Sequence, residues 1–174
     1  MNGFREFLFM RNCLAFTVLA VLILTGCAGL DMSGVPLSSP YASVRRVSAP
    51  VQCVPYAREV SGIRIRGDAY SWWDSAAPDY QRGRMPKPGA VLVLARTSKM
   101  RHGHLAVVKD VVSPRQINVT HSNWGNDKAS RRLIYDSMRI EDVSTQNDWS
   151  QVRFWNIEEN VFGFPYAARG FVYP

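Results

Sequence analysis

The sequence predicts an α+β fold, in which N-terminal helices pack on an antiparallel sheet. The first observation is that the helical patterns, near residues 54–61 and 69–76, precede the strand patterns. The second is a series of short apolar runs after residue 89, separated by turn residues and charged residues. A run of helices followed by a run of strands is typical of the α+β class.

The chain begins with the features of a signal peptide. Arg5 and Arg11 precede an apolar run at residues 13–24. A basic start, an apolar segment of about 7–15 residues and a small-residue exit describe a secretory signal, and a membrane span would need about 20 apolar residues. The exit LTGC, which ends at Cys27, resembles the lipobox of bacterial lipoproteins. An ordinary signal peptide that happens to hold a cysteine is the alternative.

We expect three segments: a lipoprotein signal peptide at 1–26, a lipidated tether at 27–49 and a folded domain at 50–174. The tether is rich in Ser, Pro and Gly and lacks periodicity. The lipobox resemblance implies a membrane anchor at Cys27, in the periplasm and at the outer membrane, because Ala28 follows rather than aspartate. A formal net charge of +7 suits anionic cell-wall polymers or lipid headgroups. Nucleic acid is not an expected partner of such a lipoprotein.

Within the domain, each element has a local signal. The first helix is expected at 54–61 and ends at Gly62, and Asp68 is a candidate N-cap for a second helix that runs to about Ala76. A Pro-Gly turn then precedes a buried strand at 90–95. Further strands are expected at 105–112, 116–121, 132–135 and 152–155.

One cysteine stands out as a candidate nucleophile. Of the three cysteines, Cys13 falls in the signal peptide and Cys27 is the lipidation candidate, which leaves Cys53 unpaired. Pro55 fits the first turn of a helix, so Cys53 is expected at the helix N-terminus, where backbone N–H groups and the helix dipole can lower a thiol pKa. Gln52 could donate to an oxyanion or simply cap the helix. A small buried apolar residue is the other reading of the cysteine.

A thiolate nucleophile needs a base, and the chain has three histidines, His102, His104 and His121. His104 opens a strand, where its side chain can be held rigidly beside a helix start. His121 and Asn123 alternate onto one face of the next strand, so either could orient the imidazole of His104. His102 fits a polar loop residue beside a glycine, with substrate binding as the alternative.

Four motifs in this order, QCVPYAR, PKPGAVLVL, GHLAVV and HSNWG, resemble the CHAP domain family over about residues 50–126. Its members are cysteine, histidine-dependent amidohydrolases and peptidases of papain-like (NlpC/CHAP-type) fold, and most of them cut peptidoglycan. The resemblance implies that Cys53 is the nucleophile and His104 the base. Many members have a glutamate where this chain has His121. Related NlpC-type peptidases use a histidine there, which favours His121 over Asn123 as the third catalytic residue.

The resemblance implies a peptidoglycan hydrolase, an N-acetylmuramoyl-L-alanine amidase or a peptide endopeptidase, that needs no metal or organic cofactor. Trp124 could wall the substrate groove. Two alternatives stay open: a non-catalytic peptidoglycan-binding lipoprotein of the same fold, and a zinc site made by Cys53 and the three histidines. The sequence does not say whether an activating partner is required.

Overall fold

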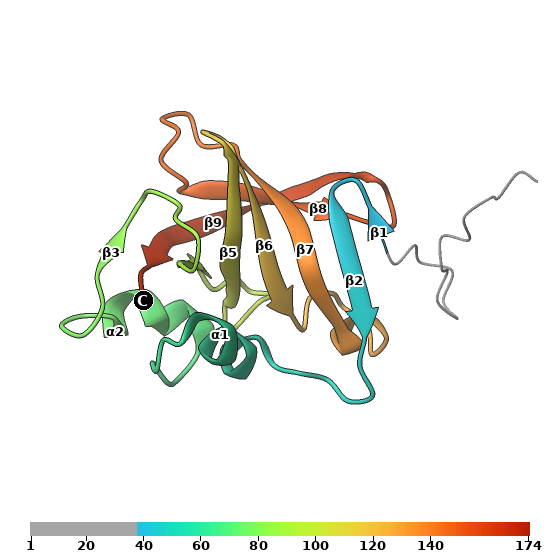
Figure 1. Ribbon diagram of the computed structural model, residues 1–174, viewed down its shortest axis with the longest axis horizontal. Helices are drawn as coiled ribbons and strands as arrows, with labels where there is room; N and C mark the ends of the chain where they lie inside the picture. Colours follow the sequence, from blue (N-terminus) through green and yellow to red (C-terminus); the bar gives the residue numbers. More distant parts are fainter. Residues whose placement is uncertain (1–37) are drawn as a thin grey trace, which may run out of the picture.

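The structure, a computed structural model, describes residues 38–174 as a fold made mainly of strands (Figure 1). The expected signal peptide at 1–26 and the lipidation candidate Cys27 lie outside the described residues. Within residues 38–174, no helix combines the length and the apolar composition that crossing a membrane would require.

The helices lie early in the described part of the chain. They are α1 (Cys53–Ser61) and α2 (Trp72–Ser75), with 3-10 turns η1 (Ala69–Ser71) and η2 (Ser130–Arg132). The strands follow in chain order as β1 (Ser38–Ser39), β2 (Ala42–Arg46), β3 (Arg82–Gly83), β4 (Val91–Leu94), β5 (His104–Ser113), β6 (Gln116–Ser122), β7 (Leu133–Asp142), β8 (Gln151–Asn156) and β9 (Val161–Val172).

Six of the strands in residues 38–174 close into an antiparallel barrel. The order around the barrel is β7, β6, β5, β4, β9 and β8, and β8 pairs again with β7 to complete the ring. The short β1 and β2 extend the sheet beyond β7, and β3 pairs with β9. A barrel of this size has no open lumen, because side chains fill its interior.

Strand β4 separates two apolar cores, and all four of its residues are buried. Leu92 and Leu94 belong to the barrel interior, whereas Val91 and Val93 pack with the helices. A strand that is buried on both faces appears in the sequence as a continuous apolar run. The second core lies between the sheet and α1 and α2, which Figure 1 shows near the first residues of β5.

The predicted α+β, papain-like fold with N-terminal helices on an antiparallel sheet is wrong. The protein is mostly β, with a closed barrel and, in residues 38–174, two short α-helices. The sequence did not reveal β9, since Gly163, Pro165 and Gly170 interrupt its apolar pattern. Its pairing with β4 and β8 closes the sheet, and pairing over such sequence distances leaves no local periodicity.

Several individual elements were predicted correctly. Helix α1 is confirmed, and it ends at Gly62, which has the left-handed conformation expected of a C-cap glycine. The predictions for β4, β5, β6 and β8 are confirmed within two residues at each end, whereas β7 is longer than the predicted 132–135.

Two local features differ in part from the expected ones. Part of the segment expected to be a tether, Ala42–Arg46, forms β2 and pairs with β7. Asp68 takes the N-cap position, of η1, but its side chain makes no capping hydrogen bond. Instead, its Oδ1 lies 3.0 Å from Nδ1 of His102.

Gly103 sets the position of the strand that carries His104. Its φ is +68°, and a Cβ at this position would lie 2.7 Å from the backbone nitrogen of Tyr70 and 2.8 Å from the carbonyl oxygen of Leu94. Both contacts are with backbone, which cannot move aside as a flexible side chain could. The entry into β5 therefore requires glycine.

We expect Gly103→Ala to lower the free energy of unfolding by about 2–4 kcal/mol, because the left-handed backbone and the backbone collision both oppose a Cβ. Gly62→Ala is the matched control, with φ +78° but no atom within 4 Å of the added Cβ, and should cost about 1 kcal/mol. Chemical denaturation measures both. Equal losses would show that the collision at Gly103 has no effect.

Candidate active site

Cys53 is the first residue of α1, as predicted, and its thiol is turned toward the start of β5. The residue is 9% exposed, and it is a free cysteine. The backbone N–H groups of Leu105, Val54 and Cys53 itself point at the sulfur. Because Leu105 follows His104 directly, the thiol is held beside the first two residues of β5.

Burial raises the pKa of the Cys53 thiol, and the three backbone N–H groups offset this only in part. The N–H groups at the helix start do lower this pKa, but burial has the larger effect. The sulfur lies in an apolar core, where the loss of hydration opposes the thiolate more strongly than the N–H groups favour it. At neutral pH the resting group is a thiol, which needs a base before it can react.

The imidazoles of His104 and His121 form a buried hydrogen-bonded pair. Nε2 of His104 lies 3.0 Å from Nδ1 of His121, and the two residues are 2% and 0% exposed. On its far side, Nε2 of His121 lies 3.3 Å from Sδ of Met138. The three side chains thus form a chain of contacts that runs from the start of β5 into the barrel.

The thioether at the end of this chain fixes where the protons lie. A methionine sulfur can only accept a hydrogen bond, so Nε2 of His121 carries the hydrogen and Nδ1 of His121 is the acceptor. Nε2–H of His104 then donates to His121. The lone pair of His104 is left on Nδ1, the ring nitrogen that His121 does not engage.

Alternation along the strands places this pair inside the barrel. His104 shares a face of β5 with Ala106, which belongs to the barrel core. Aromatic rings surround the pair: the ring of Trp124 lies 4.7 Å from that of His104, and the ring of Tyr135 stacks on His121 at 4.7 Å. Phe154 packs edge-on against His121 at 5.5 Å.

This apolar setting keeps both imidazoles neutral. Burial lowers the pKa of His104 to about 3. Burial, and then the charge that His104 would carry, hold the pKa of His121 well below its usual value. A neutral imidazole with a free lone pair is the form that can take a proton from a thiol.

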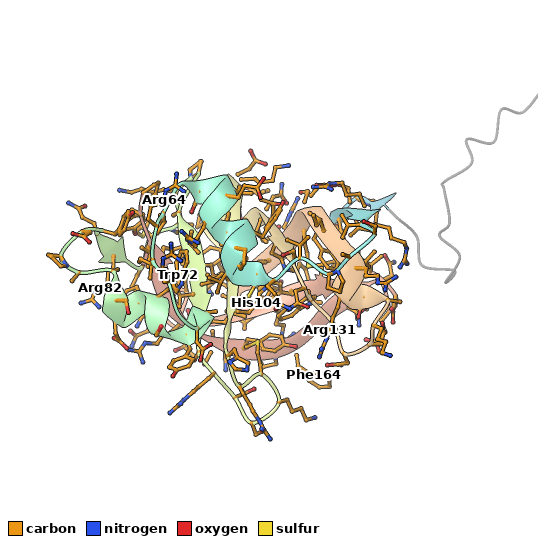
Figure 2. The ribbon with its side chains drawn as sticks, turned by 90° about the horizontal axis from the view of Figure 1, so that it is seen from below. Arg64, Trp72, Arg82, His104, Arg131 and Phe164 are labelled. Atoms are coloured by element: carbon orange, nitrogen blue, oxygen red, sulfur yellow. The ribbon has the colours of Figure 1, made fainter. Side chains whose placement is uncertain are left out.

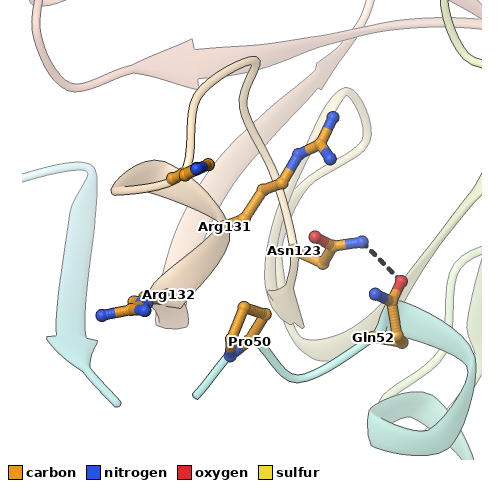
Figure 3. A pocket seen from close by; sticks show the side chains of 6 residues that line it. Pro50, Gln52, Asn123, Arg131 and Arg132 are labelled. Atoms are coloured by element: carbon orange, nitrogen blue, oxygen red, sulfur yellow. Dashed lines mark hydrogen bonds between the residues drawn. The ribbon is translucent and has the colours of Figure 1, made fainter. Parts of the chain in front are cut away.

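Asn123 bonds to Gln52 and not to a histidine. Its Nδ2 donates to Oε1 of Gln52 at 2.8 Å, as Figure 3 shows. Asn123 has φ +57°, a left-handed conformation that asparagine tolerates better than most residues. With its oxygen engaged, Gln52 keeps an Nε2 that has no hydrogen-bond partner among residues 38–174.

His102 lies outside this cluster. Its side chain is 79% exposed and bonds to Asp68, so the four side chains of the zinc alternative are not brought together. Within residues 38–174, no group of three or more His, Cys, Asp or Glu side chains is placed to hold a metal ion. Trp124, the predicted wall of the groove, is half-buried and contacts both His104 and His121.

Two contacts around the pair were not foreseen from the sequence. Met138 was missed because the predicted strand ended at residue 135, three positions before it. The hydroxyl groups of Tyr56 and Thr120 lie 2.6 Å apart and link α1 to β6. Only the prediction of a longer strand β7 could have placed Met138 on the face that meets His121.

Residues 44–123 match the CHAP domain family, a span that begins in β2 and contains Cys53, His104 and His121. No curated protein matches the chain. A solved structure of an N-acetylmuramoyl-L-alanine amidase from Staphylococcus aureus is 27% identical, with a TM-score of 0.38. The match covers 58% of this chain and 35% of the amidase chain.

We expect the free energy of unfolding to fall as the pH falls from about 6.5 toward 4. The unfolded histidines take up protons in this range, whereas folded His104, with a pKa of about 3, does not. The resulting slope is about 1.4 kcal/mol per pH unit for each such histidine. Urea denaturation at a series of pH values measures it.

Carboxylates also contribute to the pH dependence of the free energy of unfolding, and a comparison of the unchanged protein with a variant cancels their contribution. His104→Gln should lose about 1.4 kcal/mol per pH unit of the slope. Identical slopes in the variant and the unchanged protein would show that His104 titrates normally in the folded state.

Proposed function

We propose that the protein is a peptidoglycan hydrolase that cleaves amide bonds with Cys53 as nucleophile and His104 as base. The observation that carries the proposal is a free thiol at a helix start, turned toward the backbone N–H of Leu105. Leu105 directly follows His104, whose Nε2 is hydrogen-bonded to His121. The CHAP family match over residues 44–123 supports it, since this family comprises cysteine, histidine-dependent amidohydrolases and peptidases.

The neutral resting state defines the first step. The Cys53 thiol gives its proton to Nδ1 of His104 as the sulfur attacks the amide carbonyl. His104 then carries a positive charge, and its Nε2–H bond to Nδ1 of His121 stabilises that charge. His121 needs no change of protonation, because its Nε2–H already points at Met138.

The oxygen of the attacked carbonyl gains negative charge and needs hydrogen-bond donors. Nε2 of Gln52 is one, since Asn123 holds the other end of the amide. The C–N bond then breaks, and protonated His104 gives its proton to the leaving amine. Water, deprotonated by His104, hydrolyses the thioester and restores the thiol.

Digestion of purified peptidoglycan, read by mass spectrometry of the soluble products, tests the proposal. We expect new fragments from the unchanged protein, and their masses identify the bond. Cys53→Ala and His104→Ala should produce none, whereas His102→Ala should remain active because its side chain lies outside the cluster. A folded, reduced protein that binds peptidoglycan but releases nothing would favour the non-catalytic binding function.

The same assay ranks the two candidates for the third residue. His121→Asn should lower kcat by about 10²–10⁴-fold, since it removes the group that orients His104. Asn123→Ala should lower kcat by only about tenfold, because it frees Gln52 to rotate but leaves the histidine pair intact. The reverse order would assign the orienting role to Asn123.

We also propose that the chain is a lipoprotein, anchored through Cys27 at the periplasmic side of the outer membrane. The LTGC motif supports this proposal. We expect the protein in the membrane fraction of cells. Cys27→Ala should be found in the soluble fraction, because the variant lacks the residue that would carry the acyl chains, and stable anchoring requires more than one such chain. Fractionation and immunoblotting measure the distribution. Retention of the variant in the membrane would contradict anchoring through this cysteine.

A further inference from the structure

A basic pocket opens beside the segment that leads into α1. It has a volume of about 300 Å³ and lies between the segment before α1 and the segment that joins β6 to β7 (Figure 3). Its lining residues are Pro50, Gln52, Asn123, Lys128, Arg131 and Arg132. Three of them are cationic and none is acidic.

The cations of this pocket carry their charge without an acidic partner. Within residues 38–174, neither Lys128, Arg131 nor Arg132 has an ion-pair partner, and the same holds for arginines elsewhere, such as Arg64 and Arg66. Four other arginines each lie within ion-pair distance of an aspartate, and these are Arg45, Arg82, Arg115 and Arg169. The pocket therefore concentrates positive charge that no side chain of the described fold neutralises.

Asp127, the acidic residue next to Lys128 in the sequence, does not neutralise these cations. Asp127 accepts a hydrogen bond from the backbone N–H of Ser130 at 2.7 Å and another from its hydroxyl group. These bonds lower the pKa of Asp127, and the charge of Arg131 adds a smaller effect. The carboxylate is thus held in the turn that precedes η2, and Asp127 does not line the pocket.

We propose that this pocket binds a carboxylate of the peptide substrate, on one side of the amide that Cys53 attacks. The inference rests on the proposed function and names the substrate class: peptides with a free carboxylate close to the scissile bond. Gln52 lines the pocket and precedes Cys53 directly, so a group bound there lies within a residue or two of the thiol. Arginine guanidinium groups suit carboxylates because both are planar and can form paired hydrogen bonds.

A pair of muramoyl peptides tests this inference, one with free carboxylates and one with the same carboxylates converted to carboxamides. Binding is measured by calorimetry on the full chain with Cys53→Ala, which cannot turn over. We expect the carboxylate form to bind about tenfold more tightly, a difference of about 1.4 kcal/mol. Arg131→Gln with Arg132→Gln should reduce this preference to about twofold. Added salt should reduce it as well, because these side chains are exposed.

The matched control removes the same charge elsewhere. Arg64 and Arg66 are exposed, and Figure 2 shows Arg64 and Arg131 well apart, on the two sides of His104. Arg64→Gln with Arg66→Gln should leave the tenfold preference intact. An equal loss in both double variants, the absence of any preference, or no binding of either peptide would overturn the inference.

Turnover by the protein with Cys53 intact separates this inference from the proposed function. If both peptides are cleaved and the preference does not depend on Arg131 and Arg132, the inference fails and the hydrolase proposal stands. If neither peptide nor intact peptidoglycan is cleaved, the hydrolase proposal fails. The binding comparison then still decides whether the pocket recognises a carboxylate.

Discussion

Closure of the barrel by β9 is the constraint on which the rest of the structure depends. This strand pairs with β4 on one side and β8 on the other, so that β4 and β8 keep no open edge there. Closure also encloses the apolar interior in which His104 and His121 lie. Side chains inside a small closed barrel have few alternative positions, so the barrel restricts the positions open to the histidine pair.

The apolar interior also determines the chemistry of the pair. A charged imidazole is costly there, so both rings are neutral at rest. The proton on His121 faces Met138, which leaves one arrangement of hydrogens along the chain of contacts. A positive charge on His104 is then favourable only when a negative charge forms nearby, and in the proposed reaction the Cys53 thiol supplies that charge as it gives up its proton. Burial would thus couple protonation of His104 to the proposed reaction.

Local patterns in the sequence were sufficient for the elements that surround the thiol. Pro55 lies in the first turn of α1 and Gly62 ends this helix. The continuous apolar run of β4 is buried on both faces, and His104 opens β5. The barrel itself could not be predicted, because β9 is interrupted by glycine and proline and its partners lie far away in sequence. For the same reason the basic pocket was not foreseen: Pro50 and Arg132 become neighbours only through the fold.

Two electrostatic environments meet at the start of α1: the apolar core around the Cys53 thiol and the exposed cations of the basic pocket. Burial and backbone N–H groups account for the shifted pKa of the Cys53 thiol, and none of the pocket's cations contributes to it. Those cations are exposed, and solvent screens their effect on a buried sulfur. A substrate carboxylate that enters the pocket would meet them directly. In the proposed reaction, the fold therefore separates activation of Cys53, in the apolar interior, from recognition of a substrate carboxylate, at the surface near the start of α1.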